Sequence, residues 1–277
     1  MKKTGILIFL LSLCFISCLA PKIPSAKFAQ YQIEISAQFA SDSLLIRLNN
    51  TLKSPLRVKL SSTDKVLQQK FEEVGTISIH QQSDTTLTFF NTPKINGKIS
   101  YASQLGSLSK EIKSIPLALP FPSHKSHTVI QGNNSNFTHN TDYSRYAVDF
   151  NLKTNDTICA STDGFVVGVI DQYMYGGNSP KWRDYANFIT IYEPNSGIYT
   201  QYVHLVHKGS LVEVGDQVSQ GQPIGLSGNT GFSSGEHLHF SCLIPADTKE
   251  GFKSIPFQFE NGIKSTDLKR GQQLQHP

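Results

Sequence analysis

The feature that most constrains this fold is an alternation of apolar and polar residues in the first half of the chain. Side chains along a β-strand point to opposite faces in turn, so a period of two predicts half-buried strands. Turn-forming residues such as Lys53-Ser54-Pro55 separate the alternating runs. The pattern predicts a small antiparallel β-sandwich over residues 26–115, in which no catalytic cluster is visible. The alternating apolar residues are Ile33, Ile35, Ala37, Phe39, Leu56, Val58, Leu60, Ile77, Ile79, Leu87 and Phe89.

A proline-rich segment separates this half from the rest of the chain. Residues 115–122 contain Pro116, Pro120 and Pro122, and prolines at this density exclude a regular helix or a central strand. We therefore expect a domain join here, followed by a second domain over residues 116–260 and a C-terminal tail over residues 261–277. Hardly any stretch of the second domain has helical periodicity, so the expected fold class is all-β. The expected strands are 147–150, 157–160, 164–170, 188–192, 198–202 and 238–243.

A long loop lies between two of these strands. It runs from Gln172 to Ala186 and contains Tyr173, Tyr175, the pair Gly176-Gly177 and Trp182. Long loops inside compact β domains more often have a function than serve only to connect strands. We expect this loop to contribute to function.

The N-terminus predicts export. Lys2-Lys3 forms a basic start, and residues 6–16 are apolar apart from one serine. Eleven residues are too few for the ~20 that span a bilayer, but they suit the core of a signal peptide. Phe15-Ile16-Ser17-Cys18 resembles a bacterial lipobox. It implies a signal peptide over residues 1–17, a lipid on Cys18, a tether over residues 18–25 and membrane attachment at the bacterial cell envelope, in the outer membrane or periplasm. An ordinary signal peptide that is cut elsewhere stays open as an alternative.

The charge of the chain argues against one class of partner. The formal net charge is +4, and removal of Lys2 and Lys3 with the signal peptide leaves 4 − 2 = +2. A charge this small gives no support to nucleic-acid binding. Nothing in the sequence identifies a protein partner.

Two cysteines remain in the expected mature chain besides Cys18, namely Cys159 and Cys242. An exported protein can form a disulfide between them. Both also lie in apolar, strand-like runs, so two buried free thiols are an equally good interpretation. The sequence contains no CxxC pair, and a thiolate metal site therefore has no support.

The residues that can do chemistry gather near the end of the second domain. His237-Leu238-His239 places two imidazoles two residues apart, so on a strand both project from one face. Such a pair can supply a metal ligand and a proton-transfer group. In a chain with nine histidines the pair alone is a weak signal. We interpret the isolated His80, His207 and His276 as residues without a role in catalysis.

The sequence around this pair is far more specific. Several motifs, in the same order, resemble those of the LytM/lysostaphin-type zinc metalloendopeptidases, from about residue 120 to residue 243. The family has a β-rich catalytic domain with an antiparallel sheet, the duplicated hybrid motif fold. The matching segments are Tyr146-Ala147-Val148-Asp149-Phe150, residues 160–166, Tyr202-Val203-His204-Leu205, residues 214–225 and residues 225–240.

The resemblance implies a role for individual residues. Asp149 and His239 match two zinc ligands, and His204 and His237 match the two catalytic histidines that do not bind the metal. We assign no role to Glu236, because neighbours on a strand point to opposite faces.

The third zinc ligand of the family is a histidine that precedes the aspartate, and here the sequence departs from the commonest pattern. Many members have this histidine four residues before the aspartate, where this chain has Arg145. A branch of the family has a Ser/Thr-His followed by a longer loop, and Thr138-His139 looks like that branch. His139 is therefore the expected third ligand, with His127 and His124 as alternatives.

The resemblance implies hydrolysis of peptide cross-links in bacterial peptidoglycan with one Zn²⁺ as cofactor. Two imidazole nitrogens and one carboxylate leave a fourth position of Zn²⁺ open, where water becomes more acidic. The sequence has no HExxH motif, so His204 and His237 are expected to move the proton and stabilise the oxyanion. Among the known cross-links we favour stem peptides that contain D-alanine over glycine bridges.

Two other interpretations remain. A degenerate family member would bind the cell wall or activate another hydrolase without cutting, but such members lose metal ligands. The hairpin at residues 214–224 also resembles biotinyl or lipoyl carrier domains and a related sugar phosphocarrier. A carrier needs a lysine at the hairpin tip, which this chain lacks, and the phosphocarrier is cytoplasmic, which contradicts the export signal.

Overall fold

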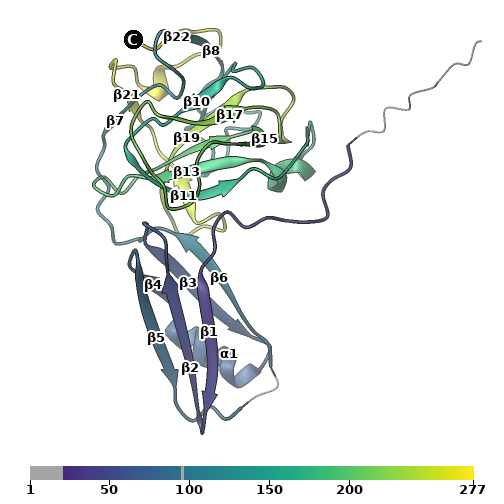
Figure 1. The fold of residues 1–277 in the computed structure, drawn as a ribbon, viewed down its shortest axis with the longest axis vertical. Coiled ribbons are helices and arrows are strands. Elements are labelled where there is room, and N and C mark those ends of the chain that lie inside the picture. The colour runs from purple at the N-terminus through teal and green to yellow at the C-terminus, as the bar shows by residue number, and fades with distance from the viewer. Residues whose placement is uncertain (1–20, 95–96) are drawn as a thin grey trace, which may run out of the picture.

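The computed structural model describes residues 21–94 and 97–277. The predicted signal peptide and the predicted lipid site at Cys18 lie outside the described residues. Figure 1 shows an elongated N-terminal part below and a larger β-rich part above. Within the described ranges, the structure contains no helix of the length and apolar character needed to cross a membrane.

The N-terminal part contains two three-stranded antiparallel sheets. Most of the alternating residues expected from the sequence face its core, although Ala37 is exposed. In this core, Leu44, Ile46 and Leu48 of one sheet lie in the same cluster as Val58 and Leu60 of the other. One sheet has the order β1 (Glu34–Ala40), β2 (Ser43–Asn50), β5 (Ser83–Phe89). The other has the order β4 (Thr76–Ile79), β3 (Leu56–Ser62), β6 (Ile99–Leu105).

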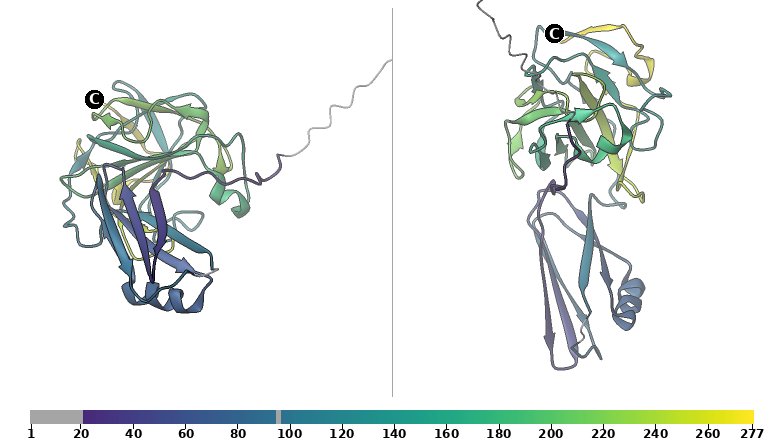
Figure 2. Two further views of the ribbon diagram at one scale, coloured as in Figure 1. Left: turned by 60° about the horizontal axis from the view of Figure 1, so that its bottom comes forward. Right: turned by 90° about the vertical axis from the view of Figure 1, so that its right-hand side faces the viewer.

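One helix, α1 (Lys65–Val74), adds to this domain and was not expected from the alternation. Leu67 and Phe71, four residues apart, lie on its buried face. Asp64 caps its N-terminus, where its side chain accepts a hydrogen bond from Leu67 N, and Gly75 ends it with a positive φ of 69°. Figure 2 shows the helix lying along one side of the domain. The cap and the spacing are local signals that were present in the sequence.

The second domain is built around a nine-stranded sheet and a smaller three-stranded one. The expected all-β class is confirmed, and the strands predicted from the sequence are found with ends shifted by at most two residues. The large sheet has the order β16 (Gln217–Val218), β11 (Gly164–Ile170), β13 (Phe188–Tyr192), β14 (Tyr199–Val203), β19 (Leu238–Pro245), β9 (Val148–Phe150), β8 (Ser126–Gln131), β22 (Gln273–Gln275), with β20 (Phe252–Ser254) beside β19. The small sheet has the order β10 (Thr157–Cys159), β17 (Pro223–Ser227), β15 (Leu205–Ser210). The remaining elements are β7 (Pro116–Leu117), β21 (Gln258–Phe259), β12 (Gly176–Gly177), β18 (Gly231–Phe232) and the 3₁₀ helices η1 (Pro180–Tyr185) and η2 (Ser265–Asp267).

The core of this domain draws on both of its sheets. Val148 and Phe240 of the large sheet belong to one cluster with Ile158 and Ile224 of the small sheet. On β19, Leu238 and Phe240 face this core, so the intervening His239 points to the opposite face. Cys159 and Cys242 are buried free thiols, which decides between the two interpretations of these residues.

The two domains share buried contacts. Tyr199 Oη lies 2.6 Å from Ser54 Oγ. The Arg57 guanidinium donates to Leu105 O and Gly106 O in its own domain, and also to two carbonyls of the second domain, Ala246 O at 2.9 Å and Gly251 O at 2.6 Å. Arg57 is only 3% exposed, so the second domain covers this part of β3.

Both ends of the described chain pack against the second domain. Before β1, Gln30 O accepts a hydrogen bond from Val169 N, and Lys27 Nζ lies 2.6 Å from Asp184 Oδ2. After residue 261, β22 pairs with β8 and buries Leu274 in the core. The packing of the second domain thus includes segments on both sides of residues 116–260.

Candidate metal centre

Two strands of the large sheet place an aspartate and a histidine side by side. Asp149 on β9 lies directly opposite His239 on β19 in the antiparallel register. Residues directly opposite one another in a sheet project from the same face. The resulting distance between His239 Nδ1 and Asp149 Oδ1 is 2.9 Å.

A third residue, His139, reaches the same point from the loop between β8 and β9. Its Nε2 lies 3.2 Å from Asp149 Oδ1 and 3.2 Å from His239 Nδ1. The ligand atoms of these three residues all lie within 4.8 Å of one another. His139 is completely buried, so the loop is anchored at this residue.

The hydrogen bonds behind the two imidazoles orient their lone pairs. His139 Nδ1 donates to Gly132 O at 2.9 Å, because a carbonyl can only accept, and Nε2 therefore presents its lone pair to the cluster. On His239, a proton at Nε2 can be donated to Ser241 Oγ at 3.2 Å, which leaves Nδ1 facing Asp149. Support of this kind is typical of histidines that bind metals.

The charge states of Asp149 and His239 suit a cation, whereas the pKa of His139 is raised, because the effect of Asp149 outweighs that of burial. Burial alone would raise the pKa of Asp149, but the neighbouring His139 and His239 imidazoles lower it well below its ordinary value. Burial lowers the pKa of His239, which favours its neutral, ligating form. A buried ionised carboxylate needs a positive partner. The two imidazole nitrogens of His139 and His239 and the carboxylate oxygen of Asp149 form a set of three ligands that fits Zn²⁺.

Two further histidines face this cluster. His237 precedes β19, and its Nε2 lies 3.9 Å from Asp149 Oδ2. His204 follows β14, and its ring centroid lies 4.5 Å from that of His237. His204 has a φ of 72°, in the left-handed region that is costly for a residue with a side chain and that often marks functional sites.

Backbone carbonyls fix which nitrogen of each of these rings is free. His204 Nδ1 donates to Thr230 O at 2.6 Å, and His237 Nδ1 donates to Gly235 O at 2.8 Å. In the neutral form each ring therefore accepts a proton at Nε2. Burial, and then the nearby His237 and His239, lower the pKa of His204 well below its ordinary value, which favours this neutral form.

Two polar residues to which the sequence motifs assign no role, Asn187 and Thr230, hold His204 in place. Asn187 is completely buried, and its backbone carbonyl accepts from His204 N at 2.9 Å. Its side chain bonds both the N–H and the carbonyl of Tyr173. Thr230 Oγ1 accepts from Asn187 N and donates to Leu205 O. The burial of both residues depends on the tertiary fold, which local patterns do not reveal. Only Thr230 had a signal in the sequence, because it lies inside a segment that matches a family motif.

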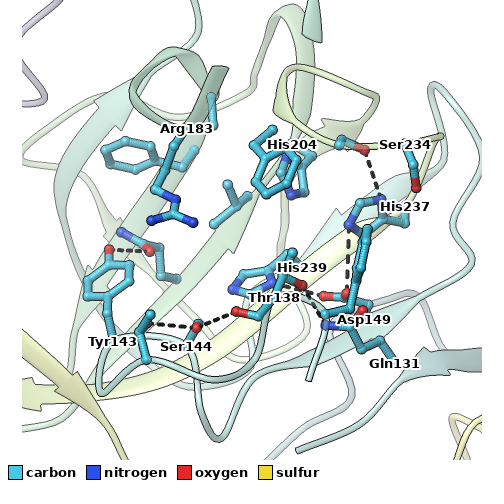
Figure 3. A pocket seen from close by; sticks show the side chains of 18 of the residues that line it. Gln131, Thr138, Tyr143, Ser144, Asp149, Arg183, His204, Ser234, His237 and His239 are labelled. Carbon is cyan, nitrogen blue, oxygen red and sulfur yellow. Dashed lines mark hydrogen bonds and ion pairs between the residues drawn. The ribbon is translucent and has the colours of Figure 1, made fainter. Parts of the chain in front are cut away.

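All five histidine and aspartate positions adjoin or line one pocket of about 910 Å³. Figure 3 shows Asp149, His237 and His239 along one side of it, with His204 above them in this view. Loops from several parts of the second domain complete the wall, including the 172–186 loop through Arg183, Asp184 and Ala186.

The other histidines considered from the sequence lie elsewhere. His127 packs its ring against Phe121, at 4.7 Å between centroids, and His276 Nδ1 donates to Phe121 O. Within the described part of the chain, the group that can hold a metal contains neither His124 nor His127. Glu236 forms an ion pair with Lys153 at 2.9 Å.

Comparison with protein families decides the identity of this domain. The model of peptidase family M23 matches residues 143–249. The second domain belongs to peptidase family M23. This result confirms the resemblance to LytM/lysostaphin-type peptidases. The match contains Asp149, His204, His237 and His239 but begins after His139.

Relatives of the M23 domain come from several bacteria. A protein of Buchnera aphidicola described as an uncharacterized metalloprotease is 30% identical over 59% of this chain and 41% of its own length. The peptidoglycan DD-endopeptidase ShyA of Vibrio cholerae is 36% identical over 35% of this chain and 19% of its own length. The glycyl-glycine endopeptidase ALE-1 of Staphylococcus capitis is 38% identical over 35% of this chain and 24% of its own length. The chain thus spans less than half the length of these curated relatives.

Proposed function

We propose that this chain is a zinc-dependent metalloendopeptidase that hydrolyses peptide cross-links in bacterial peptidoglycan. The observation that carries the proposal is the convergence of His139, Asp149 and His239 next to two pocket-facing histidines. Family membership and the names of the relatives support the same reaction.

In this proposal, His139, Asp149 and His239 hold one Zn²⁺. When bound, the ion supplies Lewis acidity, which makes water more acidic and polarises a scissile carbonyl. Asp149 stays ionised for this purpose because its histidine neighbours lower its pKa.

His204 and His237 handle the proton. Because each ring donates its Nδ1–H to a backbone carbonyl, each neutral ring accepts at Nε2. The ring that takes the proton of the attacking water becomes an imidazolium, whose Nε2–H can then donate to the oxyanion of the tetrahedral intermediate. Because backbone carbonyls hold both rings in place, this proton transfer needs no rearrangement of the pocket.

We also propose that the domain boundary and the location expected from the sequence hold for the mature protein. Residues 26–115 form a separate domain, and the join lies near residues 115–122. Export and a lipid on Cys18 keep the enzyme at the cell envelope, where its substrate is.

Metal removal tests the proposed function. Purified full-length protein is expected to contain one zinc per chain and to cut cross-linked muropeptides. A chelator should abolish cleavage and added Zn²⁺ should restore it. Zinc without any cleavage would favour a degenerate member that binds cell wall without cutting it. Protein that neither binds zinc nor cuts would contradict the metal centre itself.

A further inference from the structure

Arg183 places a positive charge on the wall of the pocket. It lies in η1, directly after Trp182, whose buried ring anchors this short helix. Figure 3 shows the Arg183 side chain directed into the pocket, between Tyr143 and His204 in this view. The guanidinium carbon lies 5.9 Å from the centroid of the Phe232 ring. A guanidinium over an aromatic face is attracted to it, which favours one orientation of the side chain.

The acidic residues of the pocket leave this charge unpaired. Asp184 pairs with Lys27, Glu236 with Lys153 and Asp142 with Arg145, and Asp149 faces the metal cluster. Glu250 also lines the pocket. None of the ion pairs among the described residues includes Arg183. A cation that is positioned on a cleft wall without an internal partner is suited to an anionic group of the ligand.

We propose that Arg183 binds a free carboxylate of the substrate, a few residues from the scissile bond. The preferred substrate is then an acidic peptide, a cross-linked stem that still bears free carboxylates, and not an uncharged oligoglycine bridge. This inference rests on the proposed peptidase function and names the substrate class of the same pocket. The planar guanidinium can form two parallel hydrogen bonds to a carboxylate, which also fixes the orientation of the peptide.

A peptide pair that differs only in charge tests the inference. The first measurement is the Kd of a stem tetrapeptide, which contains no cross-link to cut, as the free acid and with its carboxylates amidated. Full-length wild type with zinc bound is expected to bind the acid about 10-fold more tightly, which corresponds to ~1.4 kcal/mol. The second measurement is kcat/KM for the cross-linked dimer in the same two forms, and it should show the same preference.

Two variants assign the preference to one side chain. Arg183→Ala should bind acid and amide with about equal affinity while it keeps its zinc, and Arg183→Lys should show an intermediate ratio. Lys181→Ala is the matched control, because Lys181 is an exposed cation of the same helix that does not line the pocket. It should keep the wild-type ratio.

The outcomes separate this inference from the proposed function. Equal binding of acid and amide by wild type overturns the carboxylate site, as does an unchanged ratio in Arg183→Ala. If wild type prefers the acid through Arg183 but cuts no dimer, the carboxylate site is supported and the peptidase proposal fails. If the dimer is cut in both forms at equal kcat/KM and the tetrapeptides bind equally, the peptidase is supported and the carboxylate site is wrong.

Discussion

Asn187 offers the sharpest test of how the fold positions His204. Its side chain accepts from Tyr173 N at 2.9 Å and donates to Tyr173 O at 2.8 Å, with longer contacts of 3.3 Å to the carbonyls of Leu205 and Val206. Asn187→Ala leaves the buried N–H and C=O of Tyr173 without these partners. A buried polar group that loses its partner costs about 1–3 kcal/mol, so we expect a loss of about 2–4 kcal/mol in the free energy of unfolding.

The same substitution should also reduce catalysis. Asn187 connects the start of the pocket loop at Tyr173 to the backbone that follows His204, so its loss lets both move. A misplacement of about 1 Å can reduce a rate by about 100-fold, and we expect kcat to fall by about 10- to 100-fold while zinc stays bound.

Asn50 provides a matched control in the other domain. It is also completely buried, donates to Ser54 O and His80 O at 2.9 and 2.8 Å, and accepts from Leu52 N. Asn50→Ala should therefore cost a similar amount of stability but leave kcat unchanged at a temperature where both variants are folded. Urea unfolding followed by circular dichroism gives the stability, and cleavage of cross-linked dimer gives kcat. Unchanged kcat in Asn187→Ala, or an equal loss in Asn50→Ala, would refute the positioning argument.

Two further predictions concern the domain contact and the anchor. Arg57→Ala removes four hydrogen bonds to carbonyls, two of them across the domain contact, and should cost about 3–5 kcal/mol. The chain has one tryptophan, Trp182, whose fluorescence reports on the second domain alone, and its unfolding transition should shift to lower denaturant in Arg57→Ala. Arg47→Ala, which removes an exposed side chain, should change this transition little. An unshifted Trp182 transition in Arg57→Ala would show that the domains are not coupled. Cys18→Ala should release the protein from membranes or leave its signal peptide attached, as intact mass and membrane fractionation would show; a wild-type mature chain without lipid would contradict the anchor.

The parts of this molecule that could be predicted from the sequence depend on local patterns. Alternation with a period of two gave the strands, and the spacing of His237 and His239 gave their common face. Asp149 could be placed because its segment matches a family motif. The helix α1 was missed because strand-like alternation surrounds it, although Asp64 and Gly75 mark its two ends.

The parts that could not be predicted depend on contacts between distant segments. Alternation places Arg57 between Leu56 and Val58, on the face opposite to theirs, which would be solvent in an isolated domain. The second domain instead covers it with the carbonyls of Ala246 and Gly251. Likewise, no periodic pattern brings Asn187 to His204. Position in the chain predicts which face a residue occupies, but not what packs against that face.

The zinc content of single-residue variants tests the central claim most directly. Wild type, His204→Ala and His237→Ala are predicted to bind one zinc per chain, although the two variants should cut cross-linked muropeptides about 10²- to 10⁴-fold more slowly. His139→Ala is predicted to lose both zinc and cleavage, because His139 Nε2 lies 3.2 Å from Asp149 Oδ1 inside the cluster. His127→Ala, which removes a histidine outside the cluster, should keep both. Full zinc in His139→Ala together with loss of zinc in His127→Ala would contradict the proposed metal centre.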